Sequence, residues 1–225
     1  MSFTDDWASR AHRVLLSWDK SGVQELTSEE KVGWARFLYS LIIRTPAQIE
    51  SMRQRMLREL PDFVESRRAT YDGRRTSSDS SSFDKFKEEY LADPINIDPV
   101  RLLTRLLRNE DALIKIAQLR FRTIRLVGYS GPLFLTSDRP FIMTNGLAQP
   151  GAHICLPISP TVLFLAERGD QIYKALLAGG PTKLVTTVNA LVCEQAHRYV
   201  YGTDSTQLRF VENRLGTKRV ASPLG

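Results

Sequence analysis

The sequence has few of the residues that build disulfide-bonded, metal-binding or membrane-spanning proteins. Its 225 residues include only two cysteines and three histidines. Cys155 and Cys193 lie far apart in the sequence and form no CxxC pair, which predicts reduced, buried thiols in a cytoplasmic protein. The histidines are isolated, with no second histidine or carboxylate at the spacing of metal ligands, so we expect no metal site. No apolar run approaches the roughly 20 residues that cross a bilayer, and the first residues lack the apolar stretch of a secretory signal, so we expect no membrane contact.

Two catalytic loop motifs are also missing, although fragments of each occur. GYSGP at residues 128–132 resembles a nucleophile elbow, but Pro132 stands in place of the last glycine. GGPTK at residues 179–183 contains the residue types of a phosphate-binding loop in the wrong order. We interpret the first stretch as a hairpin turn and reject the second as a nucleotide site.

The charge balance is basic without being concentrated. The net charge of +6 permits contact with nucleic acid or an anionic surface but does not require it. The arginines are spread along the chain, and no arginine-rich arm or aromatic-interleaved basic stripe is present. Hydrophobic residues make up 42% of the chain, which is typical of a globular protein and not of a disordered one.

The first half of the sequence has the periodicity of helices. Apolar residues at three- and four-residue spacing predict a helix over residues 5–19. Thr27 and Glu30 have the spacing of a capping box, which predicts the start of a second helix. Because proline cannot continue the helical hydrogen bonds, we expect Pro46 to break this helix and Pro61 to end the one after it.

The rest of this half alternates between a loop and two further helices. Residues 71–82 are rich in serine and threonine and contain a glycine, so we expect a mobile loop there. A short helix is expected over residues 83–92. Asp98 as N-cap and Pro99 at the first helical position predict the start of another helix.

Near residue 120 the periodicity changes from that of helices to that of strands. Residues 121–127 and 133–137 are expected to pair as a hairpin across the GYSGP turn. Further along, the pattern predicts two strands, one helix and a final strand, over residues 153–159, 162–168, 183–197 and 198–202. The order favours a single α+β domain over residues 1–225, in which the helical N-terminal half (1–118) packs against a mostly antiparallel sheet with one helix in the C-terminal half (119–225).

The strongest candidate site follows the apolar residues of the FLTSDRP stretch. Thr136, Ser137 and Asp138 place three side-chain oxygens where the expected strand ends, and Arg139 and Pro140 turn the chain. A carboxylate beside two hydroxyls can accept hydrogen bonds, hold a cation or act as a base. The same residues also suit a structural turn, in which Asp138 bonds the local backbone and Pro140 sets the next strand.

Two further polar residues lie near the end of the chain. Asn189 is surrounded by valine and leucine on a helix that should be largely buried, and a buried amide has to find hydrogen-bond partners. We expect it to clamp a neighbouring backbone turn, with the lining of a site as the alternative. Arg198, at the head of the final strand, can pair with Asp138 if the two elements meet.

Four segments together resemble a known family. In order they are RFLYSLIIRTPAQIE, FLTSDRP, LPISP and VNALVCEQAHRYVYG. They are similar to the bacterial family catalogued as domain of unknown function 4238, and the resemblance covers roughly residues 27–202. Its most specific element is the TSD-x-P motif. Members usually open with a segment of the His-His-Tyr-Val-Pro type, which is not present here, so the chain is either a shortened relative or lacks part of the natural protein.

The resemblance indicates which residues to examine but implies no activity. The family's best candidates for a functional role map to Asp138 and Pro140, its Arg-Thr-Pro element begins at Arg44, and its last helix and strand supply Asn189 and Arg198. Our leading hypothesis is a polar pocket around Asp138 for a small or phosphorylated ligand, as in a hydrolase or nuclease with Asp138 as base or metal ligand. The alternative is a non-enzymatic module for binding protein or nucleic acid, in which the Asp138 cluster locks the fold. The sequence identifies no cofactor.

Overall fold

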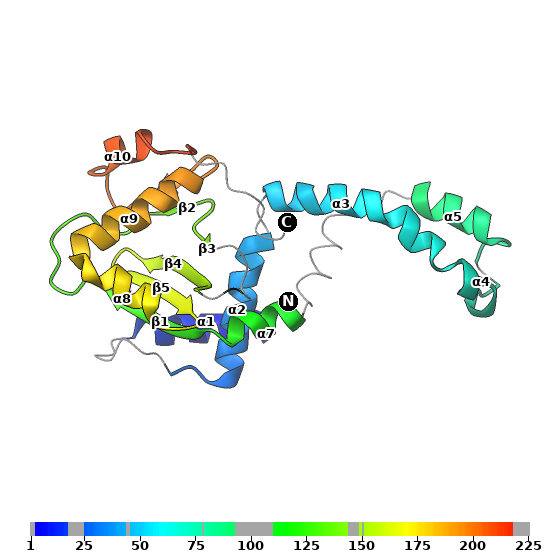
Figure 1. The fold of residues 1–225 in the computed structure, drawn as a ribbon, viewed down its shortest axis with the longest axis horizontal. Helices are drawn as coiled ribbons and strands as arrows, with labels where there is room; N and C mark the ends of the chain where they lie inside the picture. Colours follow the sequence, from blue (N-terminus) through cyan, green and yellow to red (C-terminus); the bar gives the residue numbers. More distant parts are fainter. Residues whose placement is uncertain are drawn as a thin grey trace. The chain divides into compact units, whose positions relative to one another are not determined.

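The computed structural model describes residues 3–17, 25–43, 46–77, 79–92, 110–143, 149 and 151–217 (Figure 1). By the contacts that its residues make, the chain divides into two compact units. The first comprises Met1–Ile42 with Asn109–Gly225, and the second comprises Ile43–Arg108. The first unit contains every strand of the described residues and the stretch around Asp138.

In the described residues a run of helices precedes a run of strands, which is the order of an α+β fold and confirms the predicted class. The helices are α1 (Phe3–Leu16), α2 (Ser28–Ile43), α3 (Pro46–Glu65), α4 (Arg68–Arg74), α5 (Phe83–Ala92), α7 (Glu110–Ala117), α8 (Gln171–Ala178), α9 (Gly180–Gln195) and α10 (Leu208–Glu212). The strands are β1 (Arg120–Arg125), β2 (Thr136–Ser137), β3 (Ile142–Met143), β4 (His153–Ser159), β5 (Val162–Glu167) and β6 (Val200–Tyr201).

The main sheet is antiparallel, with the strand order β1-β5-β4-β3, and β2 pairs separately with β6. Every residue of the inner strand β5 is buried. Leu163 and Leu165 belong to the same apolar cluster as Val185 and Val188 of α9, whereas Phe164 packs edge-on against Trp34 of α2 at 5.5 Å. Because successive side chains of a strand point to opposite faces, β5 is covered by helices on both sides.

The expected hairpin between residues 121–127 and 133–137 is wrong. β1 pairs with β5 along its whole length, and β2 pairs with β6. The residues on either side of the GYSGP stretch bond the β4–β5 turn instead of each other: Leu126 N–H donates to the carbonyl of Thr161 (3.0 Å), and Phe134 N–H donates to that of Pro160 (2.9 Å). The long apolar strand β5 offers more ladder bonds than a local hairpin does.

The helix starts were predicted better than the helix ends. Thr27 N–H donates to Glu30 (2.9 Å) and Glu30 N–H donates to the Thr27 hydroxyl (3.2 Å), which confirms the capping box. Pro61, however, lies inside α3, so the predicted helix end there is wrong. Leu60 and Val64 on either side of Pro61 are buried in an apolar cluster, and this packing continues the helix past the missing N–H.

Other boundaries also differ from expectation. The second half of the chain contains α8 and α10 in addition to the one helix predicted there. In the predicted loop 71–82, residues 71–74 form the end of α4, and the part that follows is tied by a bond from the Tyr71 hydroxyl to the carbonyl of Ser80 (2.7 Å). The predicted helix start at Asp98 lies outside the described residues.

Two acidic residues organise the junction of β5 and α8. Glu167, 2% exposed, accepts two backbone N–H groups in the first turn of α8, at 3.0 and 3.2 Å. Asp170 instead accepts from Arg120 (2.8 Å) and Arg122 (2.6 Å). The hydrogen bond from Arg120, with the nearby positive charges, lowers the pKa of Asp170. Glu167 thus places a buried carboxylate at the positive N-terminal end of α8 and caps that helix.

Within the described residues, none of the helices alone has the length and apolar character to cross a membrane. Only α8 and α9 taken as a pair, with a bend of 113° between them, reach that length and composition.

Candidate functional site

The FLTSDRP stretch bows away from the edge of the main sheet. Its two ends are anchored to the same neighbour, because Phe134 bonds Pro160 and Ile142 pairs with Cys155 of β4. Residues 135–141 therefore cover the same distance as the much shorter stretch 156–159 opposite them. The extra residues force the chain outward, and we call residues 135–141 the bowed segment.

Side-chain amides of α9 hold the bowed segment on its outer side. Asn189 is fully buried; it accepts the N–H of Leu135 (2.9 Å) and donates to the carbonyl of Leu133 (2.8 Å). It also donates to Gln207 (2.9 Å), which in turn donates to Leu133 (2.9 Å). Near the C-terminal end of α9, Gln195 donates to the carbonyls of Arg139 (2.5 Å) and Phe141 (3.1 Å) within the bowed segment. Asn189 acts here as a backbone clamp.

The carboxylate of Asp138 joins the bowed segment to the chain that leaves α9. One oxygen accepts the backbone N–H of His197 and the other accepts that of Arg198, both at 2.8 Å. The backbone N–H of Asp138 donates to the carbonyl of Tyr199 (3.1 Å), which continues the β2–β6 ladder. Both carboxylate oxygens of this exposed residue are therefore engaged by protein groups.

The local turn that was expected of Asp138 is made by its neighbour. Ser137 accepts the N–H of Arg139 at 3.2 Å, and Ser137 itself is buried. The contact predicted between Arg198 and Asp138 runs through the backbone N–H of Arg198. Arg44 lies outside the described residues.

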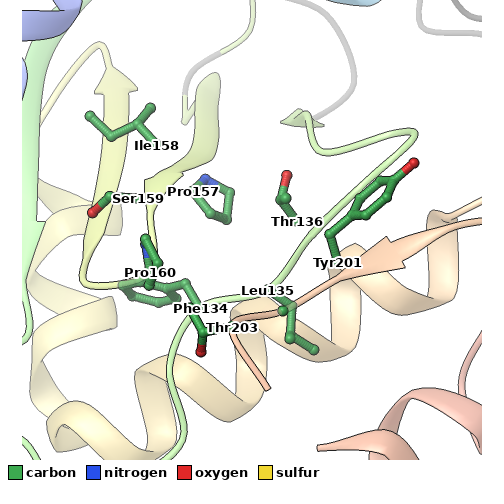
Figure 2. Close-up of a pocket in the computed structure, with 10 residues that line it drawn as sticks. Phe134, Leu135, Thr136, Pro157, Ile158, Ser159, Pro160, Tyr201 and Thr203 are labelled. Atoms are coloured by element: carbon green, nitrogen blue, oxygen red, sulfur yellow. The ribbon is translucent and has the colours of Figure 1, made fainter. Parts of the chain in front are cut away.

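On its inner side the bowed segment leaves a cavity of about 220 Å³ against β4. We call this cavity the edge pocket; its lining residues are Phe134, Leu135, Thr136, Pro157, Ile158, Ser159, Pro160, Tyr201, Gly202 and Thr203. Figure 2 shows Thr136 and Tyr201 on one side of it and the β4 residues Pro157 to Ser159 on the other. The walls are apolar with several hydroxyl groups, and none of the lining side chains is charged.

Beside the edge pocket lies an exposed pair of tyrosines. Tyr199 and Tyr201 are 57% and 55% exposed, and their rings stack with centroids 6.3 Å apart. Val200 between them packs into the core. We call the surface formed by Tyr199, Tyr201 and the cross-strand partner Thr136 the tyrosine face.

Of the tyrosine face, Thr136 was among the site residues that the sequence indicated, but Tyr199 and Tyr201 were not. The RYVYG stretch was interpreted only as a strand, although its two tyrosines alternate with a valine. Such alternation puts both aromatic rings on one face of a strand, so this signal was available. Which face is buried depends on α9 and is not written in the local pattern.

The thiols of the described residues are protonated, and the acidic side chains there form no metal-binding cluster. Burial raises the pKa of Cys155 to about 12 and that of Cys193 to about 11, which holds both thiols in the protonated, unreactive form. No group of three or more histidine, cysteine, aspartate or glutamate side chains in the described part of the chain is arranged to hold a metal ion.

The comparison with known proteins supports the resemblance noted in the sequence. Residues 2–206 match the family described as Protein of unknown function (DUF4238). The chain belongs to this family. The DUF4238 match includes the bowed segment, α9 and β6, so the whole clamp around Asp138 except Gln207 lies within it. No curated protein and no solved structure gives a significant match.

Proposed function

We propose that this DUF4238 protein is a non-enzymatic binding module in which Asp138 locks the fold and the tyrosine face, with the edge pocket, receives the ligand. The observation that carries the proposal is the engagement of both Asp138 carboxylate oxygens by backbone N–H groups at 2.8 Å. Each of these bonds occupies a lone pair of one carboxylate oxygen, and together they fix the side chain against the backbone that leaves α9, as a structural lock requires.

The chemistry of the edge pocket supports binding over catalysis. Its lining contains hydroxyls and apolar groups but no acid, base or thiol to move a proton or attack a substrate. Exposed aromatic rings beside a small pocket are instead typical of recognition surfaces, because an aromatic ring offers a large contact area with few rotatable bonds. The unpaired, buried thiols Cys155 and Cys193 support a cytoplasmic location for this module.

The Asp138→Asn variant separates a lock from a catalytic base. An asparagine keeps one acceptor oxygen but turns an NH₂ group toward the other backbone N–H. Loss of one charge-assisted bond and weakening of the other should cost about 1–2 kcal/mol and lower the melting temperature by about 3–6 °C. Glu212→Gln, which removes an exposed charge on α10 that makes no side-chain hydrogen bond or ion pair with any described residue, is the matched control and should melt like the wild type.

The measurement is thermal unfolding of both variants, followed by circular dichroism under identical conditions. An unchanged melting temperature for Asp138→Asn would refute the lock and return Asp138 to the hydrolase or nuclease hypothesis. A decrease in melting temperature equal to that of Glu212→Gln would lead to the same conclusion, since it would reflect the change in net charge alone.

A further inference from the structure

We propose that the tyrosine face binds single-stranded nucleic acid by stacking its bases on Tyr199 and Tyr201, with one base edge entering the edge pocket. This inference rests on the proposed function, because it names the ligand of the same surface.

The exposure of the two rings has no explanation in the packing of the fold. More than half of each ring residue is open to solvent, and the strand is anchored by Val200 on the opposite face. Two aromatic residues at alternate positions of a strand present adjacent flat surfaces. Every nucleobase has a flat π-face that stacks on such rings, so binding of this kind is tolerant of sequence.

The edge pocket has the size of one ring and not of a whole ligand. At about 220 Å³ it is smaller than the roughly 300–1,000 Å³ of pockets that enclose a small molecule. The Thr136 hydroxyl makes no hydrogen bond with any described residue, whereas the Ser159 hydroxyl already accepts the N–H of Thr161 (3.2 Å). Hydroxyls both donate and accept, which suits the mixed edge of an uncharged base.

The charge beside the tyrosine face suits a phosphate backbone. Arg198 immediately precedes Tyr199, is exposed, and forms no ion pair with any residue that the structure describes. The adjacent acid, Asp138, already accepts two backbone N–H groups. The whole chain carries a net charge of +6. A duplex hides the faces of its bases, so stacking on these rings selects unpaired strands.

Binding of short fluorescein-labelled oligonucleotides, measured by fluorescence anisotropy at about 50 mM salt, tests the proposal. We expect single-stranded RNA or DNA of mixed sequence to bind more tightly than the matching duplex. Tyr199→Ala and Tyr201→Ala should each weaken binding about tenfold, whereas Tyr199→Phe, which keeps the ring, should bind like the wild type. Arg198→Gln should weaken the binding of all single strands alike. It should also reduce the slope of log affinity against log salt concentration by about one.

The control is Leu208→Ala, which removes a side chain of similar exposure (56%) on α10 and should leave binding unchanged. Absence of single-strand binding at low salt overturns the inference. Duplex that binds as tightly as single strands, with both tyrosine variants still binding it, overturns the inference as well. Binding of a proline-rich peptide that is lost in the tyrosine variants, with no oligonucleotide binding, also overturns it but leaves the proposed function standing. Failure of the proposed function itself shows in the melting temperature of Asp138→Asn, which needs no ligand.

Discussion

Replacement of Asn189 tests the clamp that shapes the bowed segment. The amide is fully buried and makes three hydrogen bonds. One of them is accepted from the backbone N–H of Leu135, a residue that is only 3% exposed. In Asn189→Ala that N–H loses its partner, at a cost of about 1–3 kcal/mol. The carbonyl of Leu133 keeps its bond from Gln207, and the emptied volume adds about 1 kcal/mol. We expect a total loss of about 2–4 kcal/mol.

The assay is urea unfolding followed by tryptophan fluorescence. All three tryptophans of the chain lie within the first 42 residues, so their emission reports on the unit that contains Asn189. The matched control is Asn213→Ala, which removes an exposed amide at the end of α10 and should change the free energy of unfolding by less than about 0.5 kcal/mol.

A second substitution separates the hydrogen bonds from the volume. Asn189→Asp keeps the acceptor for Leu135 but turns an oxygen toward the carbonyl of Leu133. Burial makes the ionised carboxylate costly, so the loss of stability relative to the wild type should be larger at pH 7 than near pH 4, where protonation restores a donor. A loss below about 1 kcal/mol in Asn189→Ala, or an equal loss at both pH values in Asn189→Asp, would refute the reasoning.

Two further predictions concern groups outside the site. The lowered pKa of Asp170, caused by its bonds to Arg120 and Arg122, contributes stability that is complete above the unfolded pKa of about 4 and is lost as the pH falls below it. Unfolding of Asp170→Asn in urea should therefore depend less on pH between about 5 and 2 than that of the wild type, and an identical pH dependence would contradict the assignment. Because burial raises the pKa values of Cys155 and Cys193, native protein should not react with a thiol reagent at pH 8, whereas protein unfolded in urea should show two reactive thiols. Rapid labelling of either thiol in the native state would count against their burial.

Local signals in the sequence were sufficient for several elements. The Thr27–Glu30 capping box, the strands β4 and β5 and the helix α9 follow from side chains within a few residues of one another. The family was also evident from short motifs. These features depend on propensity, periodicity and capping, which act over one or two turns of chain and are therefore readable in order along the sequence.

The sequence by itself thus determined the α+β class and the family, because each is carried by residues close together in the chain. Tertiary structure decided the rest. The pairing of β1 with β5, the helix that continues past Pro61, and the bonds from Asp138 to the N–H groups of His197 and Arg198 all join groups distant in sequence or depend on their packing. In each case a long-range partner offered more ladder bonds, buried area or charge-assisted hydrogen bonds than the nearest neighbour, and no local pattern records that competition.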